Sequence, residues 1–290
     1  MSVWRKFFWH TTPGMKEAAM IRLLVQELKF RRGAILGWGL GLCFFPLMYI
    51  GIYPSVAEEM AGLADLEIYQ AMGMNLGTFA DWVASILVIF LPLVAAIYAI
   101  INGTGTLAGE EEDGRLEMLV TLPLPRWQIL TAKALAFSIS SAVIYLIVSL
   151  VSWGVFKAIK DQIETSLTGQ DLFLGVMAGW PLVFAMGMLA MFLAAFCSRR
   201  RIASMIAAAI LVVSYFGSNL AGSTPVLEPF EPFFLFTYLD SSGSAITTGQ
   251  AAEDVLVLLG IGLVSFILAV IFFQRRKLTV GAWPWQRGQN

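Results

Sequence analysis

Six long apolar runs divide this chain, and they constrain its fold more than any other feature of the sequence. A run of about 20 apolar residues is long enough to cross the hydrocarbon core of a membrane as a helix, whereas a barrel strand is about half as long and alternates in polarity. The runs predict an all-α polytopic membrane protein with spans at residues 33–53, 83–101, 134–156, 176–197, 202–221 and 255–273.

The composition agrees with a membrane protein and excludes several soluble classes. Of the 290 residues, 58% are hydrophobic and 13% are charged, whereas an average soluble domain is about one quarter charged. The formal net charge of −1 provides no basic surface for nucleic acid. The single histidine, His10, and the two cysteines, Cys43 and Cys197, which lie in apolar runs, argue against a metal site and a disulfide framework.

Lysine and arginine are distributed very unevenly between the two sides that six spans create. Seventeen of the 19 fall on the side that holds both termini, and only Lys157 and Lys160 fall on the other. That other side instead carries many acidic residues: Glu58, Glu59, Asp65, Glu67, Asp81, Glu228, Glu231, Asp240, Glu253 and Asp254. Because basic loops stay in the cytoplasm, both termini are predicted to be cytoplasmic.

Two absences narrow the function. No span carries an acidic or basic residue near its middle, which argues against a proton- or sodium-driven carrier. The sequence also contains no Gly-x-x-x-x-Gly-Lys-[Ser/Thr] phosphate-binding loop, so no nucleotide cofactor is expected in this chain.

The spans, residues 33–273, are flanked by two segments on the predicted cytoplasmic side. Within residues 1–32, an amphipathic stretch from Met15 to Arg32 predicts an interfacial or connecting helix. Its apolar residues repeat at helical spacing: Ile21, Leu24, Val25 and Leu28. Residues 274–290 are predicted to form a cytoplasmic tail.

The loop between the second and third spans, residues 108–133, is the most informative connection. It begins with an acidic cluster at 110–113 and continues with a short apolar stripe. It is interrupted at Pro123 and Pro125, because proline cannot continue a helix. A short amphipathic helix outside the membrane cannot bury its apolar stripe alone, so the pattern indicates docking into a groove on a partner protein. A loop helix packed beneath the bundle is the alternative.

This loop also carries a family resemblance. The run Gly109-Glu-Glu-Glu-Asp-Gly-Arg-Leu-Glu-Met-Leu, followed by Leu122-Pro123, Arg126 and Lys133, resembles the corresponding loop in the membrane subunits of ATP-binding-cassette exporters, the type-two permease family. Arg115 stands where threonine is usual, and Ala132 stands where glycine is usual. The layout is similar along the whole chain, from the N-terminal interfacial helix to the long outer segment before the sixth span.

The resemblance implies a permease subunit that is not itself an enzyme. Its expected partners are a separate nucleotide-binding ATPase subunit, which would hold ATP and Mg, and a second copy of this chain or a similar permease, in the bilayer of a prokaryotic inner or plasma membrane. Alternating access would export an apolar or amphipathic substrate. The residues implied to couple to the ATPase are Glu110, Glu111, Gly114, Arg115, Leu116, Glu117, Met118, Leu119, Thr121, Pro123 and Arg126.

Two other functions compete with transport. A non-transporting scaffold or sensor could use the same fold. The pattern Glu110-Glu111-x-x-x-Arg115 also fits the intramembrane CAAX-type proteases, but no histidine follows His10 and both glutamates lie in a loop.

The segment between the last two spans, residues 223–254, is predicted to form short re-entrant or interfacial helices that act as an outer gate or a packed cap. Polar residues of the spans and phenylalanines of this segment are the candidates for a cavity or gate: Ser138, Ser141, Ser149, Ser214, Ser218, Asn219, Phe230, Phe233 and Phe234. In the first span, Gly33, Gly37 and Gly41 form a small-residue stripe that allows close helix packing, within one chain or between two.

Overall fold

The computed structural model describes residues 13–63, 78–109, 124–197, 199–221, 224–240 and 242–275, and in these ranges it contains helices but no strand. Six helical segments are long and apolar enough to cross a membrane: Ala18–Ala57, Phe79–Leu107, Arg126–Gln162, Gly169–Phe196, Arg200–Ala221 and Ala252–Arg275. This confirms the predicted all-helical fold with six spans. The predicted tail beyond Arg275 lies outside the described residues.

The first span is longer than the sequence analysis predicted. Helix α2 (Pro13–Leu42) runs without a break across the expected boundary between residues 32 and 33 and meets α3 (Phe44–Leu63) at a turn. The 40 residues of this segment span about 60 Å at about 1.5 Å per residue, twice the roughly 30 Å hydrocarbon core. The residues predicted to form an interfacial helix therefore belong to the same continuous helix as the start of the first span.

Two spans form the centre of the bundle. The second comprises α5 (Phe79–Val83), the π-helical η1 (Ala84–Phe90), α6 (Leu91–Thr104) and η2 (Gly105–Gly109), and the fourth comprises α10 (Gly169–Met177) and α11 (Trp180–Phe196). In the most apolar 18-residue stretch of each span, 72% and 67% of the residues are buried for these two spans, compared with 22% for each of the last two spans. The other four spans surround this pair.

Close contact between α6 and α11 depends on small residues. A Cβ atom added to Gly103 would lie 2.6 Å from the carbonyl oxygen of Gly187 and 2.7 Å from the Cβ of Ala190, so the two backbones leave no room for a side chain. Close glycine-mediated packing therefore occurs between the two central spans, whereas Gly33, Gly37 and Gly41 of the first span have no such contact in the described part of the chain.

The third span also begins earlier than predicted. Helix α9 (Arg126–Ile159) starts directly after Pro125, which occupies the position before the first helical residue. Residues 126–133, which the sequence analysis placed in the loop, are therefore the first two turns of this span. The side chain of Lys133, at the end of these two turns, donates a hydrogen bond to Glu27 of α2.

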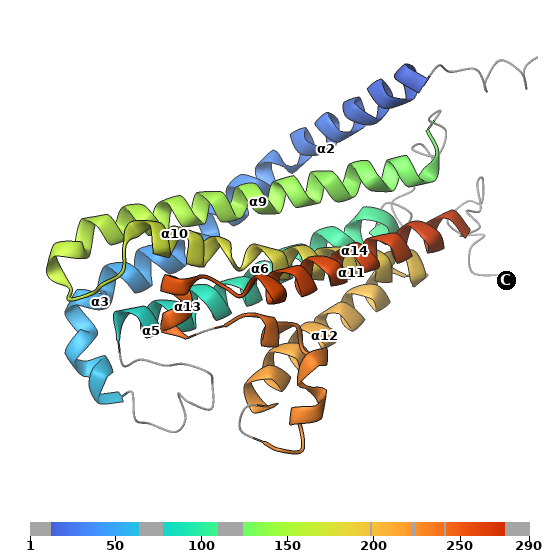
Figure 1. Cartoon of the computed structure of the whole chain (residues 1–290). Helices are drawn as coiled ribbons and strands as arrows, with labels where there is room; N and C mark the ends of the chain where they lie inside the picture. The colour runs from blue at the N-terminus through green and yellow to red at the C-terminus, as the bar shows by residue number, and fades with distance from the viewer. Residues whose placement is uncertain are drawn as a thin grey trace, which may run out of the picture.

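The last two spans are α12 (Arg200–Ala221) and α14 (Ala252–Arg275). Short helices connect them, as the sequence predicts: η4 (Glu228–Phe233), η5 (Leu235–Tyr238) and α13 (Gly243–Thr248). In Figure 1, η4 and η5 form a lobe beside the lower end of α12, whereas α13 lies apart from it near α5.

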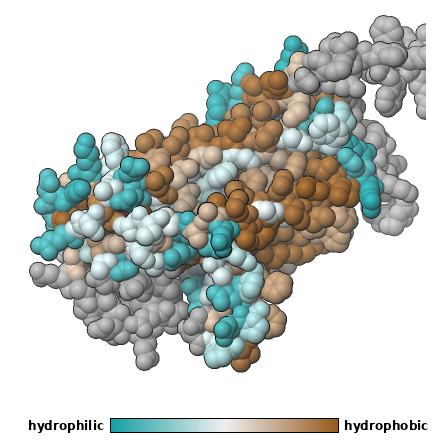
Figure 2. Space-filling model, in the orientation of Figure 1, coloured by the Kyte–Doolittle hydropathy of each residue, from teal (hydrophilic) through white to brown (hydrophobic). Residues whose placement is uncertain are grey.

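The spans alternate in direction, so the bundle has two distinct ends (Figure 1). We call one the basic end; it holds the beginnings of α2, α9 and α12 and the ends of α6 and α14. The opposite, acidic end holds α5, α13, the lobe and the beginnings of α10 and α14. Figure 2 shows apolar side chains over the middle of the bundle and many hydrophilic ones toward its ends, as expected for a protein surrounded by lipid.

Candidate functional site

The loop predicted to contact an ATPase leaves the bundle at the basic end. It connects η2, which ends at Gly109, with α9, which begins at Arg126. The predicted coupling residues from Glu110 to Pro123 lie outside the described residues. What the structure describes is how the two ends of this loop are held.

Arg126 connects the beginning of α9 to the end of α14. Its Nη1 donates a hydrogen bond of 3.4 Å to the carbonyl oxygen of Phe273, and its guanidinium carbon lies 5.9 Å from the centroid of the Phe273 ring. This is within the range of a cation–π interaction. The one predicted coupling residue that the structure describes thus contacts the sixth span.

A buried ion pair connects α9 to α2. The Nζ atom of Lys133 donates a hydrogen bond of 2.5 Å to Oε1 of Glu27. The Lys133 side chain is only 1% exposed and that of Glu27 is 15% exposed. A charge removed from water this completely requires its partner, because an uncompensated buried charge is strongly destabilising.

A second polar contact connects α2 to α6. Nη1 of Arg31 donates to the side-chain oxygen of Asn102 at 2.8 Å, and the amide of Asn102 donates to the carbonyl oxygen of Tyr98 at 2.9 Å. Nε of Arg31 lies 4.0 Å from Oε2 of Glu27. One polar cluster, Glu27, Arg31, Asn102 and Lys133, therefore joins three helices, with Asn102 seven residues before the loop begins at Gly109 and Lys133 seven residues after it ends at Arg126.

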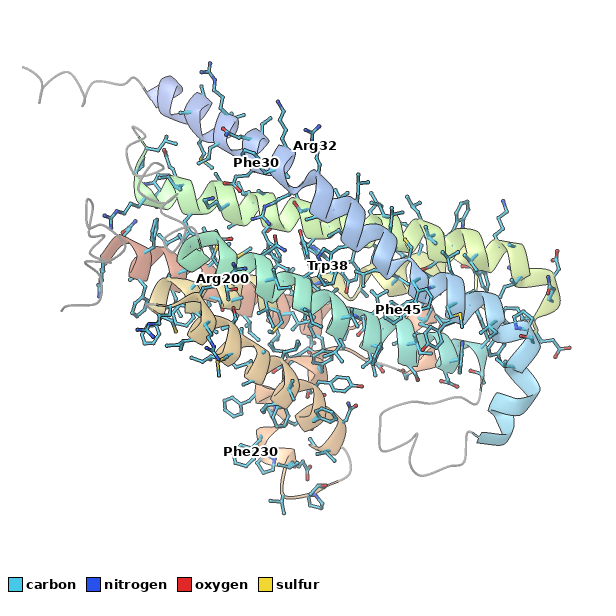
Figure 3. The ribbon with its side chains drawn as sticks, turned by 180° about the vertical axis from the view of Figure 1, so that it is seen from behind. Phe30, Arg32, Trp38, Phe45, Arg200 and Phe230 are labelled. Atoms are coloured by element: carbon cyan, nitrogen blue, oxygen red, sulfur yellow. The ribbon has the colours of Figure 1, made fainter. Side chains whose placement is uncertain are left out.

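The fifth span is connected to α6 at the same end. Ser204 donates a hydrogen bond of 3.0 Å to the hydroxyl of Thr104, and Arg200, labelled in Figure 3, donates one of 3.5 Å to the carbonyl oxygen of Ile101. Five spans are thus linked by polar contacts at the basic end.

Sequence reasoning did not identify Glu27, Arg31 or Asn102 as functional candidates. A usable signal was present in α2, where Leu23, Glu27 and Arg31 follow one another at intervals of four residues and so share one face of the helix. Leu23 is buried in a small apolar cluster with residues of α9 and its N-terminal flank: Leu124, Ile129 and Ala132. Glu27 and Arg31 therefore lie on the same face of α2 as Leu23, the face that contacts α9.

The predicted cavity serines of α9 lie among packed helices. Ser141 and Ser149 are buried, and Ser138 is half-buried. Ser138 donates to the carbonyl oxygen of Ala134 at 2.8 Å. Ser141 donates to the carbonyl oxygen of Ser138 at 3.0 Å and accepts from the indole of Trp180 at 3.1 Å. Ser138 and Ser141 thus satisfy the backbone of their own helix, a common role of serine in membrane helices.

The predicted gate residues occupy different environments at the acidic end. Phe230 and Phe233 are 56% and 80% exposed, and Phe230 lies at the tip of the lobe in Figure 3. The ring of Phe234 packs against Gly217 of α12, where an added Cβ would lie 2.4 Å from it. The hydroxyl of Ser214 accepts a hydrogen bond from the backbone N–H of Leu235 and so attaches η5 to α12.

Two predicted residues, Ser218 and Asn219, line a pocket of about 280 Å³ between the second span, α12 and the lobe. Its lining combines acidic, neutral polar and apolar side chains: Ile89, Ser218, Asn219, Glu231, Phe236, Thr237, Leu239 and Asp240. The structure brings these two candidates together with two carboxylates that the sequence analysis used only for topology.

The glycine stripe of the first span lies on an open apolar groove of about 410 Å³ between α2 and α6. Cβ atoms added to Gly33, Gly37 or Gly41 would meet nothing within 4 Å outside their own helix backbone. Trp38 and Phe45, labelled in Figure 3, line the same groove. The stripe is therefore not used for packing in the part of the chain that the structure describes.

Comparison with known proteins identifies the family. A search of curated protein sequences finds no match. A family model described as "ABC-2 family transporter protein" matches residues 23–278, which include all six spans, the loop at the basic end and the lobe. Because this match covers most of the chain, the protein belongs to the ABC-2 transporter family as a membrane permease subunit.

Proposed function

We propose that this chain is the membrane half of an ATP-driven exporter. A separate ATPase subunit would bind the loop between η2 and α9, and closure of the ATPase on ATP would move the basic end of the bundle. The observation that carries this proposal is the polar cluster of Glu27, Arg31, Asn102 and Lys133, in which Asn102 and Lys133 each lie seven residues from an end of the loop. A force on the loop would reach α2, α6 and α9 together, and a packed bundle of this kind responds by switching between discrete arrangements.

ATP and Mg belong to the partner in this mechanism. The sequence has no phosphate-binding loop, so the energy must enter through a contact between subunits. The basic end would face the cytoplasm, in a prokaryotic inner or plasma membrane, because 17 of the 19 lysines and arginines lie on that side. The acidic end would then face outward.

A second permease subunit completes the transporter in this proposal. The groove beside Gly33, Gly37 and Gly41 has no packing partner within the described part of the chain, and small-residue stripes allow close approach of helices in lipid. A second copy of this chain, or a similar permease, would pack there. The spans lack charged residues near their middle, which suits an apolar or amphipathic substrate.

Purification of the tagged chain from its native membrane tests the coupling. The chain is expected to co-purify with an ATPase whose turnover changes with a transported compound, and the separated chain should hydrolyse no ATP. Leu119→Asp places a charge on the apolar stripe of the loop and should abolish co-purification or substrate-stimulated turnover. Glu111→Ala, in the acidic run, should have little effect, because exposed ion pairs contribute about 0–1 kcal/mol.

Unchanged co-purification and turnover in Leu119→Asp would remove the loop from the mechanism. An ATPase that binds but whose turnover never responds to any compound would favour a sensor or scaffold. Orientation is tested separately with single cysteines at Ala61, Ser242 and Gln286. The first two should react with an impermeant thiol reagent outside intact cells, and reaction of the third would invert the topology.

A further inference from the structure

The pocket at the acidic end has a composition that the proposed transport mechanism does not explain. It is lined by two carboxylates, Glu231 of η4 and Asp240 after η5, together with polar side chains of α12. The backbone of Asp240 is fixed in place, since its N–H donates to Oε1 of Gln250 at 2.8 Å and its carbonyl oxygen accepts from Nε2 of Gln250 at 2.7 Å.

The hydroxyl proton of Ser218 and one of the two amide N–H groups of Asn219 are used within α12. Ser218 donates its hydroxyl proton to the carbonyl oxygen of Tyr215 at 3.0 Å, and the amide nitrogen of Asn219 donates to the same carbonyl oxygen at 3.0 Å. The Ser218 hydroxyl oxygen and the Asn219 amide oxygen keep their acceptor capacity. This wall therefore offers acceptors to a ligand.

Among the described residues that line the pocket, none is a lysine or arginine that could neutralise the carboxylates. Asp240 accepts one hydrogen bond, from the backbone of Ser242 at 2.8 Å. In the part of the chain that the structure describes, Glu231 has no ion pair or side-chain hydrogen bond. The hydroxyl oxygen of Thr237 is buried and has no hydrogen-bond partner, so the protein leaves a buried polar atom unsatisfied at this site. Such an atom is costly to leave unpaired.

Apolar side chains complete the pocket. Ile89, Phe236 and Leu239 are each at most 7% exposed and lie beside the carboxylates in the lining. In the described residues, no three histidine, cysteine, aspartate or glutamate side chains gather to hold a metal ion. A divalent cation bound through oxygen needs six or more ligands and high negative charge, whereas an ammonium group needs only three acceptors.

We propose that this pocket binds the ammonium group of an organic amine, whose hydrocarbon part extends out of the mostly polar lining. The three N–H groups of a primary ammonium donate to the carboxylates of Glu231 and Asp240 and to the amide oxygen of Asn219. This inference deepens the proposed function, on which it rests, by making cationic amphiphiles the substrate class and the pocket their site at the outer face.

Protection of a thiol from modification tests the proposal on the full chain in neutral phosphatidylcholine nanodiscs. Ser218→Cys places a reporter in the pocket, and the native Cys43 and Cys197 are buried. Phenethylammonium should slow labelling by a maleimide, whereas phenethyl alcohol, which has the same hydrocarbon part without the charge, should not. Adding Glu231→Gln should raise the concentration for half-protection about tenfold, because one charge-assisted hydrogen bond is lost.

The matched control is Glu228→Gln, which removes an exposed carboxylate of the same short helix that does not line the pocket. It should leave protection unchanged. Asp240→Asn provides a second variant if Glu231→Gln alters the labelling rate without ligand. Equal protection by the alcohol, no protection by the amine, or protection that persists in both carboxylate variants would overturn the proposal. Protection by Ca²⁺ in place of the amine would overturn the organic ligand class.

The nanodisc experiment contains no ATPase and no ATP. Its failure would therefore remove the ammonium site while leaving the coupling proposal to the co-purification experiment. Conversely, failure of the coupling experiment would leave a ligand site whose binding had been measured directly.

Discussion

The two ends of the bundle use charge in opposite ways. At the basic end, charged side chains join different helices, as Lys133 does with Glu27 and Arg126 with Phe273. At the acidic end, Asp171 caps the beginning of its own helix, and Glu231 and Asp240 line an open pocket. The contrast indicates that the basic end is built to move as one unit, whereas the acidic end keeps carboxylates accessible.

Polar contacts between membrane spans are few, so the different use of charged side chains at the two ends is informative. Hydrogen bonds between membrane helices are individually modest, yet at the basic end they connect α2, α6, α9, α12 and α14. The acidic end is also joined by hydrogen bonds between elements, such as that of Asp81 Oδ1, which accepts from the backbone N–H of Gly243 at 3.1 Å, but among the described residues its carboxylates form no ion pair. Substitutions at the two ends should therefore differ in size and reach.

The largest effect is expected from Lys133→Met. Among the described residues, the change leaves the carboxylate of Glu27 with only the 4.0 Å contact to Arg31, and breaking one side of a buried pair costs up to about 3–5 kcal/mol. We expect a fall of this order in the free energy of unfolding, measured in detergent by denaturant titration.

The double variant Lys133→Met, Glu27→Met separates the charge from the packing. It should regain much of the lost stability, because two apolar side chains can replace a buried ion pair at little cost. If its ATPase coupling remains impaired while stability returns, the pair transmits motion in addition to stabilising the helices. A single variant as stable as the wild type would show that the basic end is not locked by this pair.

Gly103→Ala should have the next largest effect. The added methyl would overlap the backbone of α11 at Gly187, and overpacking of a tight contact costs typically about 1–3 kcal/mol. The control is Gly37→Ala, on the open groove of α2, which should be neutral or stabilising in the monomer because alanine favours a helix by about 1 kcal/mol over glycine. Thermal unfolding of the two variants compares them, and equal destabilisation would mean that the groove is packed.

The number of spans was predictable because it depends on hydrophobicity alone, and the six apolar runs each correspond to a candidate span. The helix ends at the basic side were not predictable in the same way. Helices α2 and α9 continue beyond the apolar runs, and in these extensions Glu27 and Lys133, which are 106 residues apart in sequence, pair with each other. A hydropathy pattern contains no information about such a pair.

The candidate site shows the same limit. Ser218 and Asn219 were identifiable as polar residues in an apolar span, and they do line a pocket. Glu231 and Asp240 belong to a segment whose path depends on local contacts, such as the bond between Ser214 and the backbone of Leu235. Glu231 and Asp240 lie beside α12 because of the conformation of this segment, which the spacing of residues in the sequence does not predict.

Ser214→Ala should have a smaller and more local effect. It removes the acceptor for the N–H of Leu235, both residues being buried, and an unsatisfied buried donor near an open end costs about 1 kcal/mol. Hydrogen exchange should become faster in η5 and little changed in α6. Destabilisation that spreads to the whole bundle would contradict the expectation that this contact acts locally.

The smallest effect on stability is expected from replacing the two lysines at the acidic end of the bundle, Lys157 and Lys160. Lys157 lies over the ring of Trp153, with Nζ 5.5 Å from the ring centroid, and Lys160 lies 5.8 Å from the ring centroid of Phe156. Both cations therefore interact with aromatic faces and not with the carboxylates of the pocket. Replacing each by alanine should lower the free energy of unfolding by about 0.5 kcal/mol, because both side chains are exposed.

The double variant Lys157→Ala, Lys160→Ala is decisive for the charge of the pocket. If these lysines do not neutralise Glu231 and Asp240, removing them should leave the protection by phenethylammonium almost unchanged, apart from a weak long-range attraction that disappears at about 0.15 M salt. A severalfold gain in protection that persists at this ionic strength would show that one of them reaches the pocket. The carboxylates of the acidic end would then be neutralised by nearby lysines, as Glu27 is by Lys133 at the basic end. The two ends would therefore not differ in how their charges are paired.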